Sequence, residues 1–269
     1  MSWSRLQGKF SASGTSVSSL AFTAQNNTAN SLLVCMASYL ISTSTAQSGD
    51  LTISDTTNST WGRGASGWLH ISALGIYWYW GIFSVVNSYT AGKVTANVSG
   101  YNSGVSYTNL TLEEFSGELT SGSFDVGGGV NSSYVYASGQ TINGPSLTTT
   151  ANGDLILLMV VDGYEAVTSF NAGSGLTILQ TSYTGGELFQ ADEWGTQSVS
   201  GSITPTIVIT AGAGGSSGLL IFAGAFKPAG GGSANWLTMG YWENGGPYAK
   251  HRDMNQRNWR KNNGICIPS

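Results

Sequence analysis

The stretch that decides the fold occurs twice in the chain: TANSLLVCM at residues 28–36 and TANGDLILLM at residues 150–159. In both copies a polar turn precedes an unbroken apolar run, which is typical of a strand buried on both faces. Similar segments follow each copy in the same order, at offsets between about 109 and 125 residues. The sequence therefore predicts two similar halves of about five strands each.

Four further pairs of segments extend this repeat. Each half continues with an LTI segment, an aromatic strand, a strand rich in Thr or Val, and a long closing strand. The pairs are LTISDTTNSTW (51–61) with LTILQTSYTGG (176–186), YWYWGIF (77–83) with ELFQADEW (187–194), KVTANVS (93–99) with TPTIVIT (204–210), and NLTLEEF (109–115) with GLLIFAGAF (218–226).

The expected fold class is all-β. No segment of residues 1–228 has the spacing of an amphipathic helix, and turn residues recur every 8–15 positions. We predict a two-sheet jelly-roll β-sandwich with repeated halves in residues 1–228, followed by an extended C-terminal tail in residues 229–269. The glycine runs at 127–129 and 230–232 are interpreted as turns, because they lack the strand-to-helix setting of a phosphate-binding loop.

Charge divides the chain at the same boundary. Only 9% of the 269 residues are charged, which excludes long charged coiled coils and basic nucleic-acid-binding domains. Residues 1–228 hold 5 Lys and Arg against 12 Asp and Glu, a net charge of −7, whereas residues 229–269 hold 5 against 2, a net charge of +3. The Gly-rich segment KPAGGGSAN at 227–235 is typical of a flexible linker, so the tail is expected to be a separate segment.

The tail combines aromatic rings with cations, the residue types most enriched at interface hot spots. Left free in water, so many aromatic side chains would lower solubility. We therefore predict that the tail mediates assembly, either between copies of the chain as a homo-oligomer or with a larger particle, and that it does not bind nucleic acid. The predicted assembly residues are Trp236, Tyr241, Trp242, Tyr248, Arg257, Trp259 and Arg260.

Location and cysteine usage give further expectations. No run of about 18 apolar residues exists, so no membrane insertion is expected, and the N-terminus lacks the pattern of a signal peptide. Cys35 lies in an apolar run and is expected to be a small buried residue, although a disulfide with Cys266 is left open. Two cysteines and two histidines (His70 and His251) do not have the spacing of a structural zinc site.

The aromatic strand is the candidate ligand site. Because side chains alternate along a strand, Ile76, Trp78, Trp80 and Ile82 are expected on one face and Tyr77, Tyr79 and Phe83 on the other. One reading is a strand covered on both sides by core and by a loop or a neighbouring subunit. The other is a platform on which sugar rings stack, with ligand-binding residues Tyr77, Trp78, Tyr79 and Trp80.

Four carboxylates lie in predicted strands: Glu113, Glu114, Glu187 and Glu193. Glycosidases need two carboxyl groups within about 5–10 Å of each other. Adjacent Glu113 and Glu114 point to opposite faces, so a catalytic pair would need one residue from each half, for instance Glu114 with Glu193. Carboxylates at solvated strand ends are the alternative, and no catalytic residue is predicted.

Oxygen ligands for calcium are available at Asp50, Asp55 and Asn58, but turn capping explains these residues equally well. We therefore predict no metal and no cofactor.

Asp55, Asn58 and Trp61, together with EFSG at 114–117, give the chain a family resemblance. They resemble the D-x-x-N-x-W hairpin, in all but the spacing of small residues, and the E-[YF]-S-G strand end of a concanavalin A-like jelly-roll family found in phage virion proteins and bacterial secreted proteins. The resemblance covers residues 15–228 and leaves the tail unexplained. It implies a fold more specifically than an activity, since such folds host many functions.

The sequence and this resemblance together favour a non-enzymatic structural and adhesion protein of a virion, such as a tail or head fibre, released by lysis and meeting a host surface glycan. Analogy with such fibres implies a homotrimer. Two alternatives remain open: a secreted carbohydrate-binding module, and a glycoside hydrolase that uses a Glu pair.

Overall fold

The structure is a computed structural model of the chain. It describes residues 2–13, 19–21, 25–41, 51–56, 60–71, 75–86, 92–94, 97–99, 105–117, 123–135, 139–163, 167–184, 188–211 and 216–229. Contacts between Cα atoms group residues 1–231 into one unit, and residues 232–269 fall outside that unit and outside the described residues. The predicted assembly residues of the tail therefore lie outside what the structure describes.

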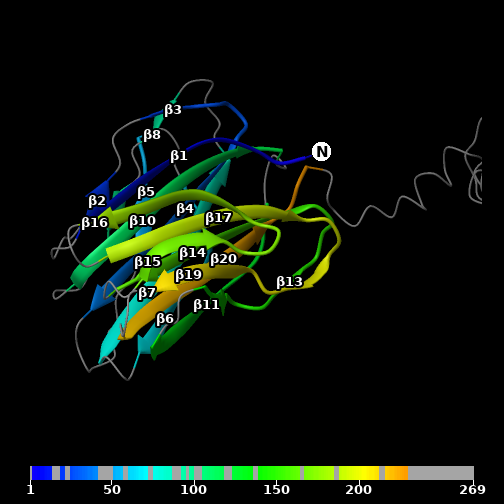
Figure 1. The fold of residues 1–269 in the computed structure, drawn as a ribbon. Coiled ribbons are helices and arrows are strands. Elements are labelled where there is room, and N and C mark those ends of the chain that lie inside the picture. The colour runs from blue at the N-terminus through cyan, green and yellow to red at the C-terminus, as the bar shows by residue number, and fades with distance from the viewer. Residues whose placement is uncertain are drawn as a thin grey trace, which may run out of the picture. The chain divides into compact units, whose positions relative to one another are not determined.

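The described residues form strands and no helix, which confirms the all-β prediction (Figure 1). Ten strands make two five-stranded antiparallel sheets. Sheet I has the order β1-β10-β4-β7-β6 and sheet II has the order β11-β20-β14-β17-β16. Their bounds are β1 Ser4–Ser13, β4 Leu32–Ile41, β6 Gly62–Ile71, β7 Ile76–Val86, β10 Val105–Ser116, β11 Phe124–Val135, β14 Asp154–Asp162, β16 Thr177–Thr184, β17 Leu188–Gln197 and β20 Ser216–Phe226.

Shorter strands form four smaller sheets. Two have three strands, with the orders β2-β9-β5 and β12-β19-β15, and two have two strands, β3-β8 and β13-β18. Their bounds are β2 Leu20–Ala21, β3 Gln25–Asn27, β5 Thr52–Ser54, β8 Gly92–Val94, β9 Asn97–Ser99, β12 Gln140–Asn143, β13 Leu147–Thr149, β15 Val167–Ala172, β18 Gly201–Ile203 and β19 Thr206–Ala211. No helix in the described ranges is long and apolar enough to cross a membrane.

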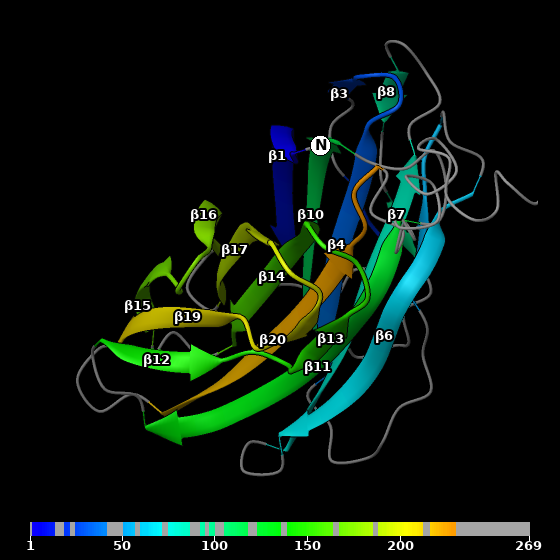
Figure 2. The same ribbon diagram turned by 90° about the vertical axis from the view of Figure 1, so that its right-hand side faces the viewer.

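Sheets I and II pack face to face, as expected for a β-sandwich, and the central core lies between them (Figure 2). Every residue of β4 and β14 is buried, which explains why both strands are apolar without alternation. From sheet I the core receives Leu32, Val34, Met36, Trp78, Trp80 and Ile82, and from sheet II it receives Leu155, Leu157, Met159, Leu220 and Phe222.

The outer faces of both large sheets are also covered, so the two-sheet prediction describes only the inner layers. Leu33, Cys35 and Ala37 of β4 pack with Leu51 and Ile53 around β5. On the other side, Leu158 and Val160 of β14 pack with residues of β12, β15 and β19, among them Ile142, Phe170 and Ile207. Cys35 is buried as predicted, and burial raises the pKa of its thiol. Cys266, its suggested partner, lies beyond the described residues.

The two halves have the same topology. Adding ten to each strand number turns every sheet of residues 1–117 into a sheet of residues 123–229. Two bulges recur as well: the one in β1 between Arg5 and Gln7 recurs in β11 between Phe124 and Val126, and the one in β6 between Arg63 and Ala65 recurs in β16 between Ile178 and Gln180. Within the two large sheets, these shared registers assign paired residues of one half a counterpart in the other.

The sequence repeat was aligned wrongly at one point. LTIS at 51–54 belongs to β5, whereas LTILQ at 176–180 belongs to β16, the counterpart of β6. The other aligned segments fall on counterpart strands or overlap them.

The glycine run at 127–129 is not a turn, because it lies inside β11. A Cβ atom on Gly129 would lie 2.5 Å from the Trp80 ring, and one on Gly127 would lie 2.9 Å from Cβ of Ala65. Glycine is required here because side chains of the other half occupy the space. The run at 230–232 lies outside the described residues.

Candidate functional site: the polar seam

The sandwich has two seams, each formed where an edge strand of sheet I meets an edge strand of sheet II. At the first, β6 lies beside β11, and at the second, β1 lies beside β16. Because the halves have the same topology, the two seams are built from counterpart strands. We call them the apolar seam (β6 and β7 against β11 and β20) and the polar seam (β1 and β10 against β16 and β17).

The apolar seam is filled by hydrocarbon. The rings of Trp80 and Phe222 lie 5.6 Å apart. Next to them, a Cβ atom on Gly224 would lie 3.0 Å from Ile82, and Phe124 packs over Gly64. Among the described residues, the side chains that meet between the four strands at this level are therefore apolar.

At the counterpart positions of the polar seam the side chains are polar. Asp192 is the counterpart of Ile82, Glu113 of Gly224, and Gln180 of Ala65. Arg5 is the counterpart of Phe124, Thr111 of Phe222, and Gln190 of Trp80. The same backbone arrangement thus carries hydrocarbon at one seam and a hydrogen-bonding network at the other.

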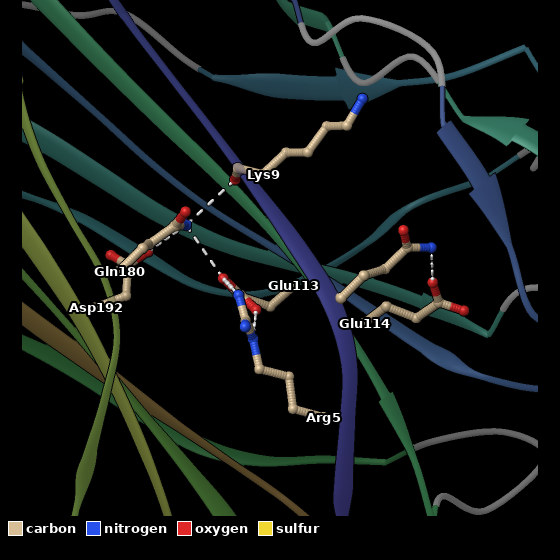
Figure 3. A network of polar contacts seen from close by, with 7 residues as sticks. Arg5, Lys9, Glu113, Glu114, Gln180 and Asp192 are labelled. Atoms are coloured by element: carbon tan, nitrogen blue, oxygen red, sulfur yellow. Dashed lines mark hydrogen bonds and ion pairs between the residues drawn. The ribbon is translucent and has the colours of Figure 1, made fainter.

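Glu113 joins the two halves at the polar seam (Figure 3). Arg5 Nε donates to Glu113 Oε2 at 2.7 Å and Arg5 Nη2 to Oε1 at 3.2 Å. From sheet II, Gln180 Nε2 donates to Glu113 Oε1 at 3.1 Å, to Asp192 Oδ2 at 3.0 Å and to the backbone oxygen of Lys9 at 3.3 Å. One amide group therefore bridges two carboxyl groups, one from each half.

Burial sets the protonation of this carboxyl pair. It raises the pKa of Glu113 to about 7, an effect that the Arg5 guanidinium partly opposes. The pKa of Asp192 lies well above its usual range, because the group is buried and because Glu113 is a nearby negative charge. Both residues are only 2% exposed, so ionising both carboxyl groups at once is unfavourable, and the pair holds a proton near neutral pH while Glu113 keeps its ion pair with Arg5.

Further along the two inner faces, the polar seam holds buried amides: Gln190 lies two residues from Asp192 in β17, and Asn109 lies four residues from Glu113 in β10. Gln190 is 1% exposed, and neither its Nε2 nor its Oε1 has a hydrogen-bond partner within the described part of the chain. Asn109 is fully buried; its Nδ2 lies 3.5 Å from Ser38 Oγ, and its Oδ1 has no partner among the described residues. Asp192 Oδ1 likewise has no hydrogen-bond partner among the described residues.

A groove of about 430 Å³ lies at one end of the polar seam. Its lining residues are Ser2, Trp3, Gly153, Gly175, Thr177, Trp194, Gly195 and Thr196. Trp3 Nε1 donates to the backbone oxygen of Gly153 at 2.9 Å, which fixes the Trp3 indole in the wall. The ring of Phe115 lies 6.5 Å from that of Trp3 and 5.5 Å from that of Trp194, and these three rings separate the groove from the carboxyl pair.

The apolar seam has a smaller groove of about 220 Å³ at the counterpart position. Gly62, Ser84 and Val86 line it where the larger groove has Thr177, Trp194 and Thr196. At these three positions the larger groove has an indole ring and two hydroxyl groups where its counterpart has a single hydroxyl group, that of Ser84.

The suggested pair of Glu114 and Glu193 is not formed. Glu114 lies on the outer face of sheet I, where it accepts hydrogen bonds from Gln7, Asn27, Thr28 and Ser31. Glu193 lies on the outer face of sheet II, where the backbone N–H of Gly173 donates to it and burial raises its pKa to about 7. The prediction that adjacent Glu113 and Glu114 face opposite sides is confirmed (Figure 3). Glu187 lies outside the described residues.

The aromatic strand β7 is mostly core. Trp78 and Trp80 face sheet II, and Tyr79 faces the outer cluster, so the predicted division of faces is confirmed. These three side chains are 0%, 6% and 4% exposed, which leaves no platform for a ligand on them. Tyr77 is half-buried, and its ring stacks on exposed His70 at 4.2 Å.

The hairpin motif is partly visible. Trp61 Nε1 donates to Asp55 Oδ2 at 2.7 Å, so the first and last residues of the motif contact each other. Asp50 and Asn58, the other suggested calcium ligands, lie outside the described residues.

Sequence reasoning missed Arg5, Gln180 and Asp192, as well as Trp3 and Trp194 in the groove. A usable signal was present in QADEW at 190–194, where Gln190, Asp192 and Trp194 share one face of the strand. The counterpart strand has Trp80 and Ile82 where this face has Gln190 and Asp192, so polar residues replace apolar ones on an inner face. Finding it requires the correct register between the halves.

Comparison of the chain with protein-family models, with curated proteins and with solved structures gave no match.

Proposed function

We propose that this chain is a non-enzymatic structural and adhesion protein whose β-sandwich binds a saccharide in the groove lined by Trp3 and Trp194. The observation that carries the proposal is this groove, which combines indole rings, small residues and hydroxyl groups. Sugar rings stack their apolar faces on indoles, and hydroxyl and backbone groups orient them. The predicted platform on β7 is replaced by a site at the end of the polar seam.

The placement of the acidic residues supports binding over catalysis. A glycosidase needs two carboxyl groups that face one substrate. Here Glu114 and Glu193 lie on outer faces of different sheets, and the Glu113–Asp192 pair lies behind the rings of Phe115 and Trp194. The described residues that line the groove include no acidic side chain.

The groove proposal is tested by blocking it. We expect Thr177→Arg, an exposed position in the groove wall, to abolish binding of the full-length chain to neutral hexasaccharides (cello-, malto-, chito-, xylo- and laminarihexaose) measured by calorimetry. The matched control is Gly62→Arg, the counterpart in the smaller groove, which should bind like the wild type. Equal binding by Thr177→Arg and wild type would place the site elsewhere.

The same incubations test the non-enzymatic assignment. No new reducing ends should appear with any of the saccharides. Release of reducing ends by the wild type that disappears in Glu114→Gln or Glu193→Gln would favour the hydrolase alternative instead.

The proposed structural role has two parts, the jelly-roll type of the fold and assembly through the C-terminal tail. The order β1-β10-β4-β7 beside β2-β9-β5 supports a jelly-roll type for each half, with two such units fused in one chain. The basic, aromatic residues 229–269 would join copies, with a trimer as the expected state, and a virion fibre is the setting that the family resemblance suggests.

Mass measurement in solution tests the assembly role. We expect the full-length chain to form an oligomer, and a chain ending at residue 229 to be a monomer. The proposed role of the tail is contradicted if both chains are monomers.

A further inference from the structure

The polar seam contains buried hydrogen-bonding atoms that nothing in the described part of the chain satisfies. They belong to Asn109, Gln190 and Asp192, all at most 2% exposed and all on inner faces of the sandwich. Such atoms are rare in folded proteins, because each keeps the cost of leaving water without a new partner. Three side chains with this cost gather at one seam.

The fold itself does not impose this cost. The counterparts of Asn109, Gln190 and Asp192 are Leu220, Trp80 and Ile82, which are fully buried or nearly so at the apolar seam. The same strand order with the same bulges therefore accepts hydrocarbon at these positions. A requirement other than folding keeps them polar on one side.

The chemistry of the polar seam matches a polyhydroxylated ligand. Its two walls carry amide and carboxyl groups, which together offer donors and acceptors for the hydroxyl groups of a sugar. Arg5, the cation of this network, is already paired with Glu113, which disfavours a phosphate, and the polar walls disfavour a lipid chain. The indoles of the groove lie at the end of this wall, one residue pair away from Glu113 and Asp192.

We propose that the polar seam opens while the apolar seam stays closed, and that a saccharide bound in the groove extends into the opened seam, where Asn109, Gln190 and Asp192 bind its hydroxyl groups. This inference rests on the proposed saccharide binding and adds the residues that recognise the sugar.

The contacts that hold each seam explain why only one opens. At the mouth of the polar seam, the Arg5–Glu113 ion pair has a 30% exposed arginine, and half-buried Gln180 supplies the other bridge. Opening returns the buried Glu113 carboxyl group to water, and this hydration offsets the loss of its contacts, because burying a charge costs free energy. Opening the apolar seam would expose Trp80, Phe222 and Ile82 to water, whereas the polar seam has Gln190, Thr111 and Asp192 at these positions and adds apolar exposure mainly at Phe115 and Trp194.

The test uses the full-length chain and the same five neutral hexasaccharides. We expect Gln190→Leu and Asn109→Leu to weaken the tightest complex at least about tenfold in Kd, while the midpoint of urea unfolding stays equal or rises. The matched control is Phe222→Leu at the apolar seam, which should lower the unfolding midpoint and leave Kd unchanged.

A second measurement follows opening without ligand. Amide hydrogens of β1 and β16 should exchange faster than those of β6 and β11, and a bound hexasaccharide should slow exchange in β1 and β16 only. The inference is overturned if wild-type Kd persists in both leucine variants, if both variants lower the unfolding midpoint, or if the two seams exchange alike. In each of these cases, the groove proposal still stands if the wild type binds a saccharide and Thr177→Arg does not. If the wild type binds none of the saccharides, both proposals are overturned.

Discussion

At the scale of single residues, buried carboxyl groups set how stability depends on pH. Burial raises the pKa of Glu113 from 4.5 to about 7, and it raises the pKa of Glu193 and Asp154 to about 7 as well. For a carboxyl group with a raised pKa, the folded state binds its proton more tightly than the unfolded state does. The stabilisation is complete below the ordinary pKa and is lost as pH rises through the raised value.

We therefore expect the free energy of unfolding to be lower at pH 8 than at pH 5. For Glu113 alone, the change from 4.5 to about 7 corresponds to roughly 3 kcal/mol. Urea denaturation followed by tryptophan fluorescence at both pH values measures the difference. Glu113→Gln should reduce it, because a glutamine does not titrate; a difference of the same size in that variant would exclude Glu113 as a source.

At the scale of elements, glycines in β11 decide how closely the halves approach. We expect Gly129→Ala to lower the free energy of unfolding by about 2 kcal/mol, because the new methyl group meets the Trp80 ring at 2.5 Å. The matched control is Gly62→Ala in β6, where the nearest atom lies at 3.5 Å and a change within about 0.5 kcal/mol is expected. Equal effects in chemical denaturation would show that Gly129 is not confined by Trp80.

At the scale of elements, the sequence predicts those strands whose residue pattern is local. The buried strands β4 and β14 and the two faces of β7 follow from unbroken or alternating apolar residues, which depend only on local pattern. The strand position of Gly127–Gly129 could not be read locally, since its cause is a ring from the other half. Likewise, Glu113 and Asp192 meet only because of the register and stacking of four strands, which no single segment specifies.

At the scale of the whole molecule, neither half should be stable alone. The inner face of sheet I carries Leu32, Met36, Trp78 and Ile82, and all of them need sheet II to be buried. We expect residues 1–120 and residues 121–229, produced separately, to lack a cooperative unfolding transition, and to recover it when they are produced together. Circular dichroism and size-exclusion chromatography provide the measurement. A folded monomer from either piece alone would contradict this account.

The difference between the seams also governs which halves can associate. Each half has one polar edge and one apolar edge. In the first half the polar edge is β1 and β10 and the apolar edge is β6 and β7; in the second half the polar edge is β16 and β17 and the apolar edge is β11 and β20. If two copies of the same half packed together, the polar edge of one copy would meet the apolar edge of the other at both seams. This mismatch disfavours pairing between identical halves of neighbouring chains during synthesis. A first half therefore pairs with a second half, and the second half of its own chain is the nearest.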